Sequence, residues 1–421
     1  MPLHRRHLLA LPLAAAAGAA LTTRAAHAAP STGGGRETGG AAAPARPPAD
    51  PPAAASATSV PFTSGTEGYD TFRIPAVVRT RRGTLVAFAE GRAASGSDTG
   101  EIDVVARRST DGGRTWGPLV RVKGGDGDTH GNPAPVVDPR TGRITLLTCR
   151  NAAGVTEHQI MAGEATAEQT RRVFVQHSDD DGRTWSAPAE ITADVKEPGW
   201  RWYATGPGHA LALTTGPHRG RLVVPANHST APPPGSPDTG TEAKYYGGHC
   251  CYSDDGGRTW RIGFTDGTPD GTVNANESTA AQLPDGRIYF NARDQHGTAE
   301  GTRCDAHSAD GGLTLTGPYR PQPALTGPVV QGSVLQPTGG PLLYAGPADP
   351  GSRARMTIRA SRDGGVHWSA VHEVSAAPAA YCDLVQVDRT TVGLLYETGE
   401  RRPYETVTFV RVPLAVLRPP V

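Results

Sequence analysis

The sequence predicts an all-β protein, a six-bladed β-propeller of four-stranded antiparallel blades. Two observations carry this prediction: one turn motif recurs along most of the chain, and helical periodicity is nearly absent. Short strand-like runs lie instead between clusters of Gly, Pro, Asp and Asn. Because no helices are available to cross over between strands, the strands must connect through hairpins, which favours antiparallel blades around a ring.

The expected strands are short and rich in aliphatic, β-branched and aromatic residues. They include Thr84–Ala89, Ile102–Arg107, Ile144–Cys149, Arg172–His177, Arg221–Pro225, Arg287–Asn291, Met356–Ala360, Val392–Tyr396 and Thr406–Val410. Two stretches do not fit this succession of short strands. Residues 151–171 form a longer, partly helix-compatible excursion, and residues 231–240 have the composition of a surface loop.

The recurring motif is Ser-x-Asp-x-Gly-x-x-Trp, an Asp box. Its copies begin at Ser109, Ser178, Ser253, Ser308 and Ser361. The copy at Ser308 ends in Leu315 instead of Trp, and the last copy has His367 where the others have Thr. Asp-x-Gly suits a tight turn, so we interpret each box as a structural hairpin turn whose Trp starts the next strand. Five boxes and one box-free segment give six blades, and the box-free blade closes the ring with strands from both ends.

The first part of the sequence differs from the rest in composition. Residues 1–28 read as an export signal, because two adjacent arginines precede an apolar run and the cleavage pattern Ala26-His27-Ala28. The arginine pair favours the twin-arginine route, with an ordinary secretory signal as the alternative. Residues 29–59 are almost all small residues and Pro, which predicts a disordered linker. We therefore expect a secreted protein whose propeller spans residues 60–416.

Charge and cysteine content exclude several classes of protein. The net charge is +0, which gives no electrostatic case for binding nucleic acid. The apolar run of the signal is too short and too rich in alanine for membrane insertion. We expect a monomer.

The five cysteines match no zinc pattern, and a disulfide between Cys304 and either Cys250 or Cys251 remains open.

Three arginines stand at expected strand ends of different blades. They are Arg73 in Phe72-Arg73-Ile74-Pro75, Arg293 in Asn291-Ala292-Arg293, and Arg353 before the last strand that feeds a box. Any one of them alone would be interpreted as a solvated surface residue. Together near the ring axis they would form a cationic pocket that needs an anionic ligand or acidic partners. Guanidinium groups bind carboxylates through two parallel hydrogen bonds, so the cluster would suit a carboxylate substrate.

Phe-Arg-Ile-Pro followed by Asp boxes resembles the bacterial exo-α-sialidase (neuraminidase) family over residues 60 to about 415. The resemblance implies that Arg73, Arg293 and Arg353 clamp the carboxylate of sialic acid, with Arg355 as a nearby competitor for the third place. Glu397, in Leu-Leu-Tyr-Glu, resembles the glutamate that holds the first of these arginines.

The same resemblance implies an acid–base residue in the loop after Glu90-Gly91-Arg92. The candidate is Asp98, with Asp103 as a rival carboxylate and a solvated loop residue as the alternative interpretation. Arg92 matches an arginine that contacts the sugar near its O4.

The resemblance also implies that Tyr381 is the nucleophile and that Glu277 works with it. In isolation, Tyr381 would be interpreted as a packed aromatic and Glu277 as a turn residue. Their spacing adds weight, because Glu277 lies 16 residues before Arg293 and Tyr381 lies 16 residues before Glu397. A neutral phenol avoids the repulsion that a carboxylate nucleophile would meet beside the anomeric carboxylate of sialic acid. Its high reference pKa demands a base, which Glu277 can supply, and nearby arginines would favour the phenolate.

Two further segments are less specific. Residues 200–208 resemble the stretch beside the N-acetyl pocket in that family, although core packing explains them equally well. Asn132 lies on a similar loop and receives no role.

We expect a retaining exo-α-sialidase that acts on sialylated glycans, glycoproteins or glycolipids and that uses no metal or cofactor. The alternatives are a trans-sialidase, a glycosidase for a related nonulosonic acid, a non-catalytic sialic-acid-binding propeller, and an adhesion protein that merely carries Asp boxes.

Overall fold

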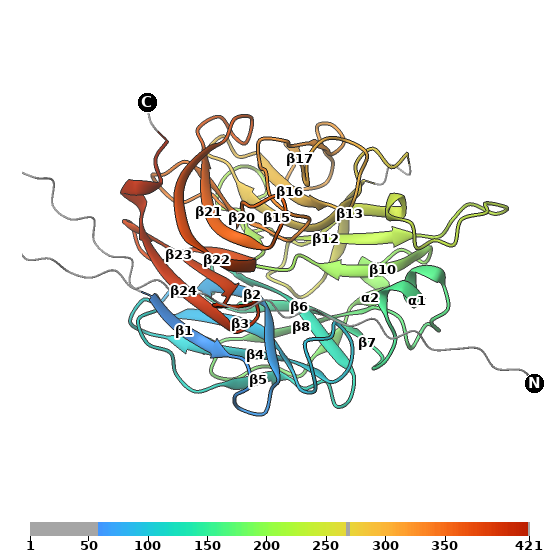
Figure 1. The fold of residues 1–421 in the computed structure, drawn as a ribbon, viewed down its shortest axis with the longest axis horizontal. Coiled ribbons are helices and arrows are strands. Elements are labelled where there is room, and N and C mark those ends of the chain that lie inside the picture. Colours follow the sequence, from blue (N-terminus) through green and yellow to red (C-terminus); the bar gives the residue numbers. More distant parts are fainter. Residues whose placement is uncertain (1–57, 267–269, 420–421) are drawn as a thin grey trace, which may run out of the picture. The chain divides into compact units, whose positions relative to one another are not determined.

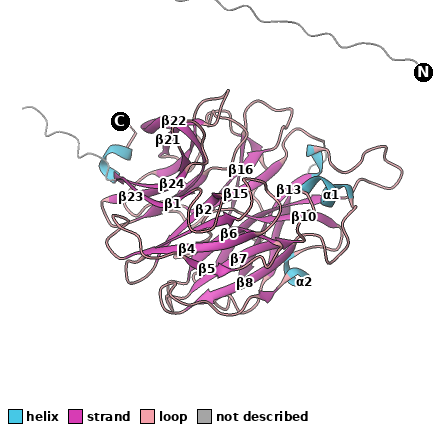
Figure 2. Ribbon diagram, turned by 60° about the horizontal axis from the view of Figure 1, so that its bottom comes forward, coloured by secondary structure: helices cyan, strands magenta, loops and turns pink. Residues whose placement is uncertain are grey.

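The computed structural model describes residues 58–266 and 270–419. The expected export signal, residues 1–28, and residues 29–57 of the expected linker lie outside the described residues. Strands are the main regular structure of the described chain, and the short helices lie at its edges (Figure 2). This strand content confirms the all-β prediction. The sheets are β-propeller-like, and their strands pair antiparallel apart from one parallel bridge between Ile102 and Thr129.

The strands form four hydrogen-bonded sheets. The first contains β1 (Thr58–Thr63), β24 (Thr406–Pro413), β23 (Thr391–Thr398), β22 (Ser369–Gln386), β21 (Ala354–Ser361), β20 (Leu342–Pro347) and β19 (Ser333–Leu335), in that order. The second contains β2 (Thr71–Arg79), β3 (Leu85–Arg92), β4 (Ile102–Ser109), β6 (Thr129–Val137), β7 (Ile144–Asn151), β8 (Arg172–Ser178) and β9 (Ala189–Glu190), with β5 (Val120–Lys123) beside β4.

The remaining two sheets are smaller. One contains β10 (Trp200–Thr205), β12 (Leu222–Thr230), β13 (Tyr246–Ser253) and β14 (Arg261–Asp266), with β11 (Leu211–Ala212) beside β12. The other contains β15 (Ala275–Gln282), β16 (Ile288–Asp294), β17 (Arg303–Ser308) and β18 (Arg320–Pro321). The helices are α1 (Glu157–Ala162), α2 (Thr192–Val195) and the 3-10 turns η1 (Ala243–Tyr245) and η2 (Leu414–Leu417).

Strands from the two ends of the described chain pair with each other. β1 runs antiparallel to β24, with Ser59 opposite Phe409 (blue and red in Figure 1). The strand begins at Thr58, so Thr58 and Ser59 belong to it and not to the linker. The hydroxyl of Ser59 donates to the carbonyl of Gly113 at 2.5 Å, which ties this strand to the first Asp box.

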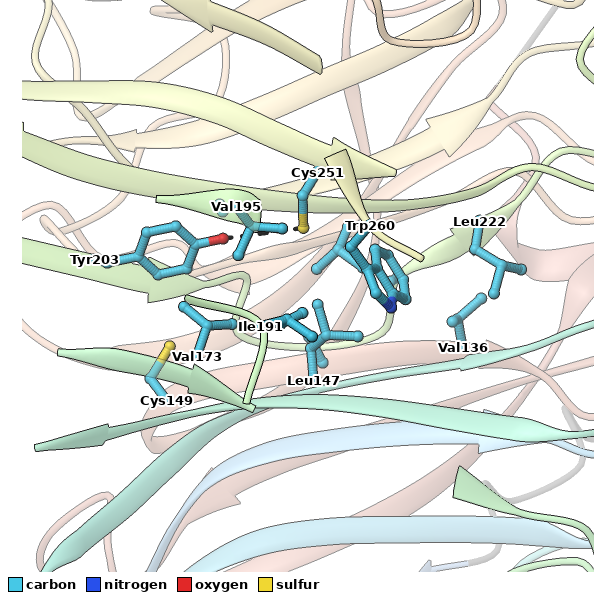
Figure 3. Close-up of a cluster of buried hydrophobic side chains, with 14 of the residues drawn as sticks. Val136, Leu147, Cys149, Val173, Ile191, Val195, Tyr203, Leu222, Cys251 and Trp260 are labelled. Atoms are coloured by element: carbon cyan, nitrogen blue, oxygen red, sulfur yellow. Dashed lines mark hydrogen bonds between the residues drawn. The ribbon is translucent and has the colours of Figure 1, made fainter. Parts of the chain in front are cut away.

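Apolar side chains fill the space between neighbouring sheets. Figure 3 shows one such cluster, in which Leu147 and Val173 from the second sheet meet Tyr203 and Cys251 from the third, with Trp260 from the turn before β14. Successive residues of a strand point to opposite faces. Burial of these side chains stabilises the fold by roughly 1.5–3 kcal/mol each.

The cysteines do not form the disulfide that the sequence left open. All five are free and buried. Cys250 and Cys251 are neighbours on β13 and therefore lie in two different apolar clusters. The thiol of Cys304 faces the carbonyl of Ala292 at 3.7 Å, and that of Cys250 faces the carbonyl of Gly312 at 3.2 Å.

Each Asp box is a turn held by its own side chains. In the second box, the hydroxyl of Ser178 donates to Asp180 at 2.9 Å and accepts from the amide of Gly182 at 2.8 Å. Asp180 also accepts from the amide of Thr184 at 2.9 Å and from its hydroxyl at 2.7 Å. Gly182 has φ 78°, a conformation that favours glycine. Each box serine is the last residue of its strand.

The box tryptophans do not start the next strand, contrary to our interpretation. Trp116 lies before β5 and Trp260 lies before β14. Two of them pack on their own turn: the indole N–H of Trp260 donates to the carbonyl of Gly257 at 3.2 Å, and Trp368 does the same in the last box. The indole of Trp116 instead reaches β1 and donates to Ser59 at 2.9 Å.

The two interruptions of the repeat are surface features. Residues 151–171 contain α1, which begins with a capping box between Thr156 and Gln159 and ends at Gly163 with φ 77°. Residues 231–240 form the projecting loop after β12 (Figure 1). Among the described residues, no helix has the length and apolar character needed to cross a bilayer.

Candidate active site

A polar cavity of about 230 Å³ collects residues from several sheets at one end of their strands. Its wall contains seven of the eight residues that the sequence analysis singled out: Arg73, Arg92, Asp98, Glu277, Arg293, Arg353 and Tyr381. The eighth, Glu397, lies directly behind the wall with its side chain fully buried. A wider, largely aliphatic hollow elsewhere contains none of these eight residues.

Tyr381 and Glu277 form the centre of the cavity. The phenol of Tyr381 donates to Oε1 of Glu277 at 2.7 Å, although the two residues lie on β22 and β15. Nη1 of Arg293 donates to Oε2 of the same glutamate at 3.0 Å and lies 3.4 Å from the phenol. Burial and the charge of Glu277 raise the pKa of Tyr381, and these effects outweigh Arg293 and Arg73. Arg293 and Arg73 each lower the pKa and so favour the phenolate, as expected, but burial and Glu277 have the larger effect.

Arg73 is fixed from behind by Glu397. Nε of Arg73 donates to Oε1 at 3.1 Å and Nη2 donates to Oε2 at 3.3 Å. Glu397 also accepts from the backbone amides of Ile74 at 2.8 Å and Tyr381 at 3.1 Å. Ile74 has φ 57°, a strained value for a β-branched residue, within an irregularity of β2. One buried carboxylate thus positions both the arginine and the backbone of the tyrosine.

Arg353 and its competitor Arg355 lie in different places. Arg353 belongs to the cavity wall, where its Nη1 donates to the hydroxyl of Tyr404 at 2.7 Å. Arg355 is paired with Glu373 at 2.9 Å, and its side chain is 55% exposed. Arg355 has φ 63° at a register shift of β21, and this bulge turns its side chain away from the cavity.

Asp98 lies in the loop between β3 and β4 and faces two arginines. Its Oδ1 is 2.7 Å from Nη1 of Arg92 and 3.5 Å from Nη1 of Arg73. Desolvation by the surrounding protein would raise the pKa of Asp98, but Arg92 and then Arg73 lower it below its usual value. The rival carboxylate Asp103 is bound to scaffold groups instead: it accepts from Tyr69 at 2.7 Å and from the amide of Gly125 at 2.5 Å.

Arg92 holds the loop that carries Asp98. Its Nη1 donates to the carbonyls of Gly96 at 2.7 Å and Ser97 at 3.0 Å. Its Nε and Nη2 donate to Glu90 at 3.1 and 2.7 Å. The sequence suggested only a contact between Arg92 and the sugar. The structure adds that this buried guanidinium joins β3 to the loop.

The cavity also contains residues that the sequence analysis missed. Arg171 stacks on the indole of Trp202, with its guanidinium carbon 4.3 Å from the ring centre. It donates to Asn151 at 3.0 Å and also to Asn132, the residue left without a role. Trp202 belongs to the segment that we could not separate from core packing. The interruption of the repeat at residues 151–171 was the one signal that could have indicated Arg171.

The same excursion contributes an acidic residue. Glu157, the first residue of α1, lies in the cavity wall and accepts a hydrogen bond from the phenol of Tyr246. Tyr246 is the first residue of β13, far from Glu157 in the sequence. No sequence pattern linked these two residues.

Comparisons with known proteins agree with this architecture. The family model described as a BNR repeat-like domain matches residues 83–394. The sialidase of Micromonospora viridifaciens is 33% identical over 355 residues, which cover 80% of this chain and 51% of that protein. The exo-alpha-sialidase of Aspergillus fumigatus is 33% identical over 316 residues, which cover 70% of this chain and 69% of that protein.

The chain belongs to the sialidase family. A solved structure, that of the Hadza microbial sialidase Hz136, superposes with a TM-score of 0.71 at 27% identity and covers 86% of this chain and 69% of that one. The chain spans about half the length of the Micromonospora sialidase. In this sialidase chain, Arg73 and Glu397 both lie outside the stretch that the repeat model matches. The pocket therefore depends on strands beyond the repeats.

Proposed function

We propose that the protein is a retaining exo-α-sialidase that releases terminal α-linked sialic acids from glycans, glycoproteins or glycolipids through a tyrosyl-enzyme intermediate. One observation carries the proposal: a phenol hydrogen-bonded to a carboxylate lies in the same small cavity as three guanidinium groups. A carboxylate-binding site without chemistry would need the arginines, but it would not need a phenol paired with a base.

The proposed binding step uses Arg73, Arg293 and Arg353 to hold the substrate carboxylate. Each charge-assisted hydrogen bond contributes about 1.5–3 kcal/mol, and a guanidinium can give two in parallel. Because the carboxylate stays bound throughout the reaction, much of this stabilisation is uniform. Loss of one arginine should therefore raise KM, with a smaller effect on kcat.

The proposed nucleophile is Tyr381. Since burial and Glu277 raise the pKa of its phenol, the hydroxyl is neutral in the empty site. Glu277 accepts the phenolic proton at 2.7 Å as the oxygen attacks the anomeric carbon, and the bond from that carbon to the leaving oxygen breaks. Arg293, which contacts both groups, compensates the negative charge that passes between them.

The proposed acid–base residue is Asp98. It gives a proton to the leaving glycosidic oxygen in the first half of the reaction. In the second half it removes a proton from water, which attacks the anomeric carbon and frees the tyrosine. The two displacements on the same carbon together retain its configuration.

We also propose a division of the sheets into six blades. The proposal is supported by the five boxes, which fall at regular places in the strand order, and by the pairing of β1 with β24. We further propose signal-directed export, with a linker before β1, from the sequence of residues 1–57. We also propose that the protein is a monomer.

The test is the release of free sialic acid from sialyllactose, followed by product analysis. Hydrolysis predicts equimolar sialic acid and lactose, and proton NMR should show the α-anomer first. Binding of sialyllactose without cleavage would indicate a non-catalytic binding protein. Regeneration of sialylated lactose from added lactose would indicate a trans-sialidase.

A further inference from the structure

The carboxylate of Asp98 occupies the arginine cluster in the empty site. Its Oδ1 contacts Arg92 at 2.7 Å and Arg73 at 3.5 Å, yet the side chain is 81% exposed. Because the side chain is so exposed, it can turn away from the arginines without unpacking the core. The surrounding loop contains Gly96 and Gly100, and Gly100 has φ 124°.

The arginines and the carboxylates of the wall are equal in number only when Asp98 is counted. The charged and titratable groups around Asp98 are Arg73 on β2, Glu90 and Arg92 on β3, Arg353 before β21, Tyr381 on β22, Glu397 on β23 and Tyr404 after β23. Further along the wall are Glu277 with Arg293, and Glu157 with Arg171. The arginines of this set and its carboxylates, Asp98 included, are equal in number.

A substrate carboxylate would add one negative charge to this balanced set. Three of the carboxylates are well shielded, since the side chains of Glu397, Glu90 and Glu277 are 0%, 6% and 11% exposed and each is bonded to an arginine. Asp98 is the exposed one and lies beside Arg73, where the new charge would enter. Arg73 already contacts both Glu397 and Asp98, so a third anion would add repulsion that is relieved when the exposed Asp98 leaves or takes up a proton.

We propose that Asp98 is the counter-ion of the empty carboxylate clamp, and that the substrate carboxylate displaces it from Arg73 and makes it take up the proton that it then donates. This inference rests on the proposed function. Substrate binding itself then causes protonation of the general acid. The entering carboxylate replaces Asp98 at the guanidinium of Arg73, and solvent supplies one proton to Asp98. That proton later goes to the glycosidic oxygen. Arg92 is a positioning residue that keeps the loop carbonyls of Gly96 and Ser97 in place during the exchange.

The sign of the linkage follows from the charges. In the empty site the arginines lower the pKa of Asp98, so the carboxylate is ionised near neutral pH. A bound carboxylate neutralises Arg73 and repels Asp98, and both effects raise its pKa. The bound state therefore holds more protons than the free state. By linkage, affinity for a carboxylate ligand must increase as the pH falls through the pKa of the bound form.

The experiment is a calorimetric titration of the whole protein with the didehydro-deoxy analogue of N-acetylneuraminic acid, which has the carboxylate but no leaving group. Titration in buffers of different ionisation enthalpy gives the number of protons taken up per bound ligand. We expect an uptake that reaches about half a proton per bound ligand at mildly acidic pH, as a pKa shift of one unit implies. The methyl ester of the same analogue, which has no charge, should bind without uptake.

Two variants locate the proton. Asp98→Asn should abolish the uptake and, near pH 8, should bind the analogue about tenfold more tightly than the wild type, as one unit of pKa implies. Glu157→Gln removes a wall carboxylate that is bonded to the phenol of Tyr246, and this control variant should retain the uptake. Tight binding without proton uptake, or uptake that persists in Asp98→Asn, would overturn the inference and leave the proposed hydrolysis intact. An analogue that does not bind, together with uncleaved sialyllactose, would overturn both.

Discussion

The Asp boxes and the polar cavity use the same residue types in opposite ways. In a box, serine, aspartate, glycine and threonine bond to one another within a few positions, and the pattern repeats five times. In the cavity, partners come from distant parts of the chain: Arg73 pairs with Glu397 from another sheet, and Tyr381 with Glu277. The side-chain oxygens of the box serine and aspartate are used by their own turn, whereas the guanidinium groups of the cavity line a space that a ligand can enter.

The difference separates the residues that stabilise the fold from the residues that would carry out the reaction. A box closes its own hydrogen bonds, so it can stabilise a turn wherever it occurs. The cavity exists only when all the sheets are assembled, because no single sheet contains the phenol, its base and the three arginines together. Substitutions in the two regions should therefore act on different quantities, activity in one and stability in the other.

The largest effect is expected for Tyr381→Phe. The substitution removes only the phenolic oxygen, so the apolar packing of the ring is retained, while the proposed nucleophile is lost. We expect kcat on sialyllactose to fall by at least about a thousandfold, with little change in melting temperature. A kcat near the wild-type value would exclude Tyr381 as the nucleophile.

Asp98→Ala should separate substrates by their leaving groups. Natural glycosides need a proton on the leaving oxygen, and general acid catalysis typically contributes about 10²–10⁴-fold. Aryl sialosides with good leaving groups need little proton assistance and should lose much less activity. The comparison is kcat/KM for sialyllactose against a nitrophenyl sialoside. Equal losses on the two substrates would contradict the acid role.

On the box side, Trp116→Ala should lower stability without lowering kcat. The indole packs edge-on against Phe409 with ring centres 5.5 Å apart, and it is bonded to Ser59 on β1. Truncation of a buried Trp costs about 3–5 kcal/mol, and this half-buried one should cost about 2 kcal/mol. The matched control is Trp116→Leu, since the box at Ser308 has Leu315 in this place, and it should retain part of the stability. A drop in kcat at an unchanged melting temperature would overturn the structural interpretation.

The smallest expected effect is a loss of stability in acid. Burial would raise the pKa of Asp180, but bonds from the amide and hydroxyl of Thr184 and from Ser178 lower it to about 2. Similar box contacts lower the pKa of Asp255 to about 2. Because the pKa is lower in the folded state than the unfolded value of 3.8, the ionised carboxylate stabilises the folded state above that pH. This stabilisation is lost as the pH falls from 3.8 through the folded pKa of about 2. Melting temperature measured from pH 5 to 2 should therefore decrease, and Asp180→Asn should reduce the slope. If the melting temperature of Asp180→Asn decreases with the same slope as that of the wild type, ionisation of this box aspartate does not cause the loss of stability in acid.

Local chemistry explains how far the sequence could predict this structure. The boxes and the ends of their strands were predictable because their contacts span only two to four residues. Arg353 and Arg355 could not be separated, since residues two apart in a regular strand share a face and only the bulge at Arg355 turns it away. The pair formed by Glu157 and Tyr246 joins α1 to a different sheet, a contact set by packing and not by any spacing. The free thiols on β13 likewise follow from tertiary packing.

The pairing of β1 with β24 also constrains biosynthesis. During translation, β1 emerges early and has no edge to join until β24 has left the ribosome. Glu397, which holds Arg73, lies on β23, just before β24. A nascent chain is therefore unable to complete the carboxylate clamp, and competence to bind ligand begins only after β23 and β24 have been synthesised.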